Sequence, residues 1–132
     1  IKGKAEKSLQ YILKALEDEN GSVDLKRWSN QGVLLINTAF TCEVNSIGSH
    51  YDLWKPFSKY IFENINRHKK DIPVILMGKK AESWEIHLNN QKIFKVTHPA
   101  SAAYRGGEWD CKNVFALVNA ELDKQEKTWI EW

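Results

Sequence analysis

Three short apolar runs, each of the length of a β-strand, most constrain how this chain can fold. They are Val33–Ile36, Val74–Met77 and Ile93–Thr97, and polar or turn-forming residues flank them. Continuous apolar runs of this length are typical of strands that are buried on both faces. Segments with helical periodicity alternate with them, which favours parallel βαβ units. The sequence therefore predicts an α/β fold with a parallel sheet.

Helices are expected around and between these strands. The first begins at Ser8, carries one apolar stripe at helical spacing, and ends at Asn20-Gly21. Further helices are expected over residues 23–29, 54–67, 81–88 and 110–124. The buried side of the helix over 54–67 is expected to hold Trp54, Phe57, Tyr60, Ile61 and Ile65.

Size and composition fit a single globular domain over residues 1–132. Of the 132 residues, 42% are apolar and 27% are charged. Cys42 and Cys111 make neither a disulfide framework nor a metal-binding spacing, so we expect free thiols in a reducing compartment: the cytoplasm, or the nucleus of a eukaryote. No apolar run of about 18 residues and no signal-peptide pattern occurs, which predicts neither a membrane span nor export.

The third apolar run leads into a stretch rich in candidate site residues. Residues 95–111 read Lys-Val-Thr-His-Pro-Ala-Ser-Ala-Ala-Tyr-Arg-Gly-Gly-Glu-Trp-Asp-Cys. The proline after His98 restricts the histidine backbone to extended conformations. Ligands of open α/β sheets bind beyond the carboxyl ends of strands, which makes His98 a candidate site residue. A loop histidine with one satisfied hydrogen bond is the alternative interpretation.

A second block precedes this stretch in the chain. Residues 24–38 read Asp-Leu-Lys-Arg-Trp-Ser-Asn-Gln-Gly-Val-Leu-Leu-Ile-Asn-Thr. Together the two blocks resemble the Gln-Gly-Val-Leu-Leu-Leu-Asn motif and the histidine motif of the family 1 uracil-DNA glycosylases. The resemblance runs from about Ser8 to the last residue. It implies a three-layer α/β/α fold with a central parallel sheet, in a monomer that uses no metal or organic cofactor.

The resemblance also implies a reaction. Family members flip a nucleotide out of DNA and hydrolyse the N-glycosidic bond of uracil, which leaves free uracil and an abasic site for base-excision repair. His98 would donate a hydrogen bond to uracil O2 as the base leaves as an anion, and a neutral imidazole can do this. Such stabilisation is worth on the order of a few kcal/mol in a water-excluded site. Whether an inhibitor protein or a replication partner also binds stays open.

Asn37 ends the first apolar run at the same predicted sheet edge as His98. Its amide has one acceptor and two donors, which can donate to uracil O4 and accept from N3–H. Cytosine presents the reverse pattern, and a rigidly held amide would reject it strongly. Asparagine also favours turns, so a turn cap is the alternative interpretation of Asn37.

Three residues are candidates for contact with DNA phosphates. Ser8 matches the serine of the family motif Ser-Leu-x-x-Ile, Ser101 matches the serine after the catalytic histidine, and Lys79 stands where the family often has serine. A lysine there would add a charge–phosphate interaction. The net charge is only +2, so any DNA-binding face must be local. Without the family context, each of the three is a plain surface residue.

The loop after His98 departs from the family pattern Pro-Ser-Pro-Leu-Ser. Residues 99–103 read Pro-Ala-Ser-Ala-Ala, and the leucine that wedges into the vacated base stack is missing. Tyr104 and Arg105 are the candidate DNA-intercalating residues, since inserted side chains can hold a kinked duplex.

The amino-terminal part of the sequence departs further from the family pattern. The family's water-activating motif Gly-Gln-Asp-Pro-Tyr and its stacking aromatic in Gly-Leu-x-Phe do not occur in the sequence. Three interpretations stay open: an active glycosylase, a non-enzymatic module that binds DNA or a protein partner, and a chain that omits segments before Ile1 and between Ala5 and Ser8. The family sheet has four parallel strands, and losing an interior one leaves buried edge groups unpaired at about 1–3 kcal/mol each. We therefore expect the isolated chain to fold poorly and to be inactive.

Overall fold

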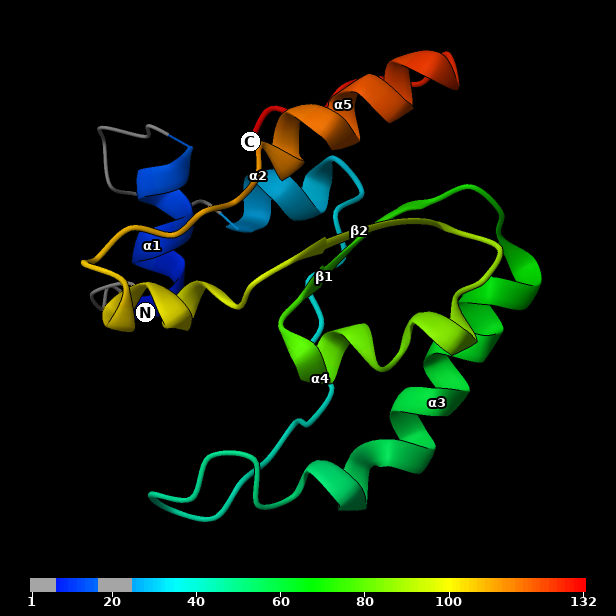
Figure 1. The fold of residues 1–132 in the computed structure, drawn as a ribbon. Coiled ribbons are helices and arrows are strands. Elements are labelled where there is room, and N and C mark those ends of the chain that lie inside the picture. Colours follow the sequence, from blue (N-terminus) through cyan, green and yellow to red (C-terminus); the bar gives the residue numbers. More distant parts are fainter. Residues whose placement is uncertain (1–6, 17–24) are drawn as a thin grey trace.

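The computed structural model describes residues 7–16 and 25–132 of the chain. Helices surround a small central sheet, as the ribbon in Figure 1 shows. The elements, with η for 3₁₀ helices, are α1 (Lys7–Ala15), α2 (Leu25–Asn30), α3 (Tyr51–His68), β1 (Pro73–Met77), α4 (Lys79–Glu82), η1 (Glu85–His87), β2 (Lys92–Val96), η2 (Pro99–Tyr104) and α5 (Val114–Lys124).

The two strands β1 and β2 run parallel. They pair in register from Pro73 with Lys92 to Met77 with Val96. The connection between them carries α4 and η1, so both strands end at the same edge of the sheet. This arrangement confirms the expected parallel βαβ unit and two of the three expected strands, the second shifted by one residue.

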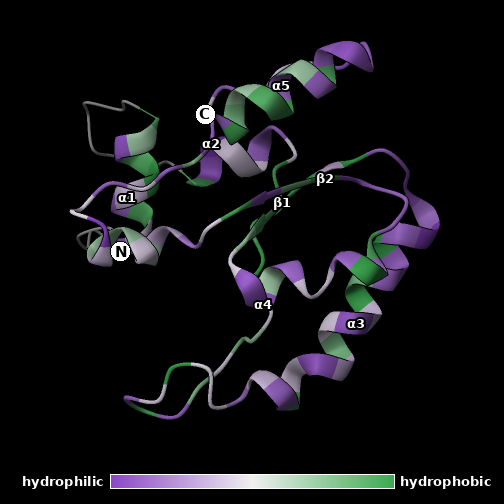
Figure 2. Ribbon diagram, viewed as in Figure 1, coloured by the Kyte–Doolittle hydropathy of each residue, from purple (hydrophilic) through white to green (hydrophobic). Residues whose placement is uncertain are grey.

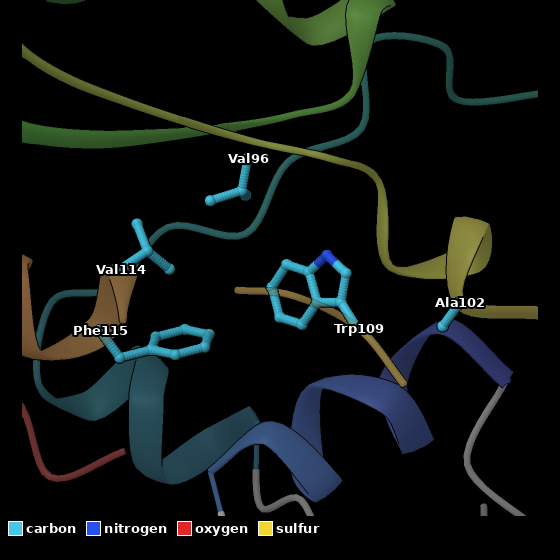
Figure 3. Close-up of a cluster of buried hydrophobic side chains, with 5 residues drawn as sticks. All are labelled: Val96, Ala102, Trp109, Val114 and Phe115. Carbon is cyan, nitrogen blue, oxygen red and sulfur yellow. The ribbon is translucent and has the colours of Figure 1, made fainter. Parts of the chain in front are cut away.

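One face of the sheet packs against α1, α5 and η2. Its buried cluster consists of Val96, Ala102, Trp109, Val114 and Phe115. Figure 3 shows these side chains converging from β2, η2, the segment between η2 and α5, and the start of α5. Ile12 and Leu16 of the predicted α1 stripe pack against this cluster, so the stripe faces the core as expected. Asn20-Gly21, the expected end of this helix, lies outside the described residues.

The opposite face is covered by α3, α4 and η1. Phe62, Trp84 and Leu88 form its buried cluster with Leu76 of β1. Alternate residues of a strand point to opposite faces, which is why Ile75 joins the first cluster and Leu76 the second. Each surrounding helix mixes hydrophobic and hydrophilic residues, as a helix with one buried side should (Figure 2). Helices on both faces of a parallel sheet confirm the α/β/α class.

The prediction of a strand over Val33–Ile36 is wrong, because these residues form no strand in the structure. The chain leaves α2 through a turn in which Val33 N–H donates to Trp28 O at 3.1 Å. Leu34 and Leu35 are 66% and 51% exposed, so the run is not buried on both faces. A strand needs a ladder partner, and within the described part of the chain β1 pairs only with β2.

The long helix α3 spans Tyr51–His68 rather than residues 54–67, and the side it buries agrees with the expected one only in part, since Ile61 packs against the buried cluster. Ser58 and Phe62 are its buried residues, whereas Phe57 and Tyr60 are exposed. Aromatic residues at helical spacing predict the helix, but they do not identify the side that meets the sheet.

Three other helices differ from expectation at their ends. The helix expected over residues 23–29 is α2, described from Leu25 to Asn30, and residues 23 and 24 lie outside the described part. The helix expected over 81–88 divides into α4 and η1. The last helix begins at Val114 rather than residue 110, because Lys112 and Asn113 have φ of 48° and 58°. These left-handed conformations cannot continue a right-handed helix.

Candidate functional site

His98 lies directly beyond β2, at the carboxyl edge of the sheet. Its backbone is extended, with φ −66° and ψ 135°, and it caps η2. The backbone N–H of Ala100 donates to its Nδ1 at 3.1 Å. Because a backbone N–H can only donate, Nδ1 must offer a lone pair, and the neutral ring carries its proton on Nε2. The exposed ring therefore presents Nε2–H as a donor.

Gly78 brings the end of β1 against His98. A Cβ on Gly78 would lie 3.0 Å from the Cβ of His98. Gly78 has φ 90° and ψ 167°, a region that essentially only glycine adopts. Lys79 follows, so the structure brings two predicted site residues, Lys79 and His98, to one sheet edge. The sequence signal for Gly78, a glycine directly after a buried strand, predicts only that the strand ends there.

Asn37 is exposed and lies on the segment that joins α2 to the loop over residues 38–50. Ile36, before it, packs on the buried cluster beneath α3. Thr38, after it, accepts a hydrogen bond at its carbonyl oxygen from Ser58 Oγ of α3 at 2.9 Å. Among the described residues no hydrogen bond or ring contact joins Asn37 to His98. The backbone on either side of Asn37 is thus fixed by its neighbours, and the Asn37 side chain is exposed.

Ser8 and Ser101 come from elements that contact each other, α1 and η2. Ser8 lies in the first turn of α1, and Ser101 lies within η2, where its backbone N–H donates to His98 O at 2.9 Å. Lys14 Nζ donates to Gly107 O at 3.5 Å and so links α1 to the loop after η2. The structure thereby places both serines on elements adjoining the His98 loop.

Tyr104 and Arg105 lie at the end of η2. Tyr104 is 92% exposed, and Arg105 is exposed as well. The backbone N–H of Arg105 donates to Ala102 O at 3.0 Å, which ties this corner to a fully buried residue of the core. Both side chains can therefore reach a ligand from a fixed backbone.

Carboxylates balance lysine charges near the end of β1 and the start of α3. Lys79 Nζ lies 3.0 Å from Glu82 Oε2. Lys55 donates a hydrogen bond to Asp52 at 2.8 Å; this bond, with the attraction of the two charges, lowers the pKa of Asp52 and raises that of Lys55. Exposed ion pairs of this kind contribute little free energy. A phosphate can therefore replace Glu82 as the partner of Lys79 at small cost.

Other features lie apart from this edge. No three His, Cys, Asp or Glu side chains gather to hold a metal ion in the described parts of the chain. Cys42 and Cys111 are free thiols, as expected. Of the helices in the described ranges, none has the length and apolarity to cross a membrane. A hollow of about 510 Å³ between β2 and α5 contains none of the predicted site residues, and its lining is Phe94, Leu117, Ala120, Glu121, Asp123 and Lys124.

Comparison with known sequences points to one family. Residues 2–123 match the Uracil DNA glycosylase superfamily. A uracil-DNA glycosylase of Campylobacter jejuni is 36% identical over 133 residues, covering 95% of this chain and 57% of the relative. One of Agathobacter rectalis is 34% identical and covers 95% and 59%, and one of Escherichia coli is 32% identical and covers 82% and 48%. The chain spans about half the length of these relatives.

Solved structures give the same fold. A mimivirus UNG variant in complex with UGI superposes with a TM-score of 0.83 at 21% identity, covering 100% of this chain and 58% of that one. The mimivirus uracil-DNA glycosylase superposes with a TM-score of 0.79 at 19% identity, covering 98% and 54%.

Proposed function

Because the chain belongs to the uracil-DNA glycosylase superfamily, we propose that the full-length protein hydrolyses the N-glycosidic bond of uracil in DNA. The products are free uracil and an abasic site, which base-excision repair then processes. The observation that carries the proposal is the state of His98. Its Nδ1 is occupied by the N–H of Ala100, and its exposed ring offers Nε2–H at the carboxyl edge of the sheet.

His98 is the proposed catalytic residue. As the glycosidic bond breaks, negative charge develops on the departing base and reaches its O2 oxygen. A hydrogen bond from Nε2–H to O2 is stronger to this anion than to neutral uracil, so it lowers the barrier. The Ala100 N–H supports this role, since it holds the ring in the tautomer that donates from Nε2.

Asn37 is the proposed reader of the base. Its amide NH₂ donates to uracil O4 and its amide oxygen accepts from N3–H. Cytosine offers a donor where uracil offers O4 and an acceptor where uracil offers N3–H, so both contacts would be lost. A buried mismatch of two polar groups rejects the wrong base strongly.

The DNA backbone is proposed to cross the edge formed by Ser8, Lys79 and Ser101. Hydroxyl groups and a lysine are suitable phosphate partners, and the lysine adds salt-dependent affinity. Tyr104 and Arg105, exposed beside this edge, are the proposed side chains that fill the vacated base stack.

A second candidate function is a catalytically inactive module that binds DNA or a protein partner. One observation favours this module: the sequence does not contain Gly-Gln-Asp-Pro-Tyr, the water-activating motif of the family that it resembles. Such a module would recognise uracil-containing DNA without activating the water that attacks the sugar.

One experiment separates the two functions. The full-length protein is incubated with matched oligonucleotides that carry uracil, thymine or cytosine at one position, as single strands and as duplexes. The glycosylase is expected to release free uracil from the first alone, and His98→Ala is expected to abolish most of the release. Preferential binding of the uracil oligonucleotide without release would support the inactive module. An outcome with neither binding nor release would refute both the glycosylase and a module that binds DNA.

A further inference from the structure

The segment that carries Asn37 is not held by the sheet. Residues 33–37 form no strand, and in the described part of the chain β1 pairs only with β2. An amide that must reject cytosine by leaving polar groups unpaired has to be rigid, because a mobile one would turn and satisfy either base. Something other than a ladder must therefore fix the backbone beside Asn37.

Ser58 of α3 supplies such a contact. It is 0% exposed, in the middle of an 18-residue helix. A serine in a helix commonly bonds back to a carbonyl of its own helix. The hydroxyl of Ser58 instead donates to the carbonyl oxygen of Thr38 at 2.9 Å, one residue after Asn37. A hydrogen bond away from water has few competing partners, so it fixes the Thr38 peptide firmly.

A second contact from the same helix holds the chain three residues further on. Trp54 Nε1 donates to Thr41 Oγ1 at 2.8 Å, and the same hydroxyl lies 2.9 Å from His50 Nδ1. Phe40 packs edge-on against Trp54, with ring centroids 5.0 Å apart. Thr38, Phe40 and Thr41 thus each contact α3.

We propose that Ser58 is a positioning residue for base recognition, which acts through the Thr38 carbonyl to hold Asn37 in the orientation that reads uracil, with the Trp54–Thr41 bond as its second support. This inference rests on the proposed role of Asn37 as the reader. Ser58 is buried behind the segment and does not touch the base itself. Its removal should therefore impair turnover only as far as Asn37 contributes to turnover.

A double-mutant cycle tests this dependence. In the full-length protein, Ser58→Ala is expected to lower single-turnover uracil release by about tenfold to a hundredfold, the scale of a misplacement of about 1 Å. In an Asn37→Ala background the same change is expected to have little further effect, since neighbours that act through one group are not additive. Affinity for undamaged DNA is expected to stay unchanged, and Ser58→Thr, which keeps the hydroxyl, should restore most of the lost rate.

Asn119→Ala is the matched control. Asn119 on α5 exchanges two partly buried hydrogen bonds with Ile130, so its loss lowers stability without touching the Asn37 segment. It is expected to leave uracil release unchanged in both backgrounds. If Ser58→Ala has the same effect with and without Asn37, or no effect on release, Ser58 is only structural and the proposal is overturned.

Thr41→Val keeps the proposal testable should Ser58→Ala fail to fold. Valine keeps the shape of threonine but cannot accept the Trp54 N–H, and Thr41 lies on an exposed loop. It is expected to lower uracil release in the same Asn37-dependent way, by a smaller factor. Full activity of Thr41→Val alongside an unfolded Ser58→Ala overturns the proposal. Uracil release by the wild-type protein is measured first. If the wild-type protein releases no uracil, the proposed function is refuted instead.

Discussion

The indole Nε1 of Trp109 donates a hydrogen bond to the carbonyl oxygen of Thr97 at 2.9 Å. Trp109 belongs to the buried cluster of Figure 3, with its ring edge-on to Phe115 at 6.2 Å between centroids. Thr97 immediately precedes His98. The peptide that delivers the candidate catalytic histidine is therefore tied to the centre of the core and not only to the end of β2.

Trp109→Phe should separate the hydrogen bond from the packing. Phenylalanine keeps an aromatic ring in the core but leaves the carbonyl of the half-buried Thr97 without its indole donor, and a buried group without its hydrogen bond costs about 1–3 kcal/mol. We expect a loss of unfolding free energy in that range, measured by urea denaturation. Trp129→Phe is the control, because Trp129 is exposed and its change should stay within about 0.5 kcal/mol. Equal midpoints for the two variants would mean that the Trp109 bond contributes nothing.

Gly78→Ala should disturb His98 directly. The alanine Cβ would lie 3.0 Å from the His98 Cβ, and the φ and ψ of Gly78 cost a non-glycine residue about 1–3 kcal/mol. We expect lower stability and slower uracil release. Gly32→Ala is the matched control, since Gly32 also has positive φ, 87°, but no atom within 4 Å of the added Cβ. If both variants release uracil equally fast, the contact between Gly78 and His98 does not position the ring.

His98→Ala should lower the rate of the chemical step by roughly two orders of magnitude, because it would remove the proposed hydrogen bond to the departing base, which forms mainly in the transition state. DNA affinity should change much less. Rapid-quench measurement of uracil release and a separate binding titration give the two quantities. His68→Ala, at the far end of α3, is expected to leave both unchanged. Equal losses of binding and chemistry in His98→Ala would make His98 a residue that positions DNA.

The sequence predicts the parts of this fold that depend on local pattern. Runs such as Val74–Met77, the stripe of α1 and the placement of His98 after a strand follow from residue order alone. The apolar run Val33–Ile36 wrongly predicts a strand. A strand forms only beside a second strand that pairs with it, and an apolar run gives no information about that second strand. The contact of Ser58 could not be predicted from the sequence either, because its hydroxyl meets the Thr38 carbonyl only once α3 packs across the loop.

Asn37→Asp should change which base is accepted. A carboxylate oxygen accepts a hydrogen bond where the amide NH₂ donated, which matches the amino group of cytosine and mismatches O4 of uracil. We expect measurable cytosine release and a large loss of uracil release, assayed on oligonucleotides that differ in the one base. Asn64→Asp, at a half-buried position of α3, controls for the added charge and should keep uracil specificity. An Asn37→Asp protein that still releases uracil at the original rate and ignores cytosine would remove Asn37 from base recognition.

Lys79→Ala should weaken DNA binding without regard to sequence. The Lys79 ammonium stands at the sheet edge beside Gly78, and its ion pair with Glu82 is exposed enough to be exchanged for a phosphate. Losing one phosphate contact should reduce the slope of log affinity against log salt concentration by about 0.9. Fluorescence anisotropy over a salt series, with several unrelated DNA sequences, measures this slope. Lys92→Ala is the control, because Lys92 forms a comparable exposed pair with Asp71 but sits at the opposite, amino-terminal edge of the sheet. The Lys92 variant should keep the wild-type slope, and a Lys79 variant that also keeps it would place Lys79 outside the DNA interface.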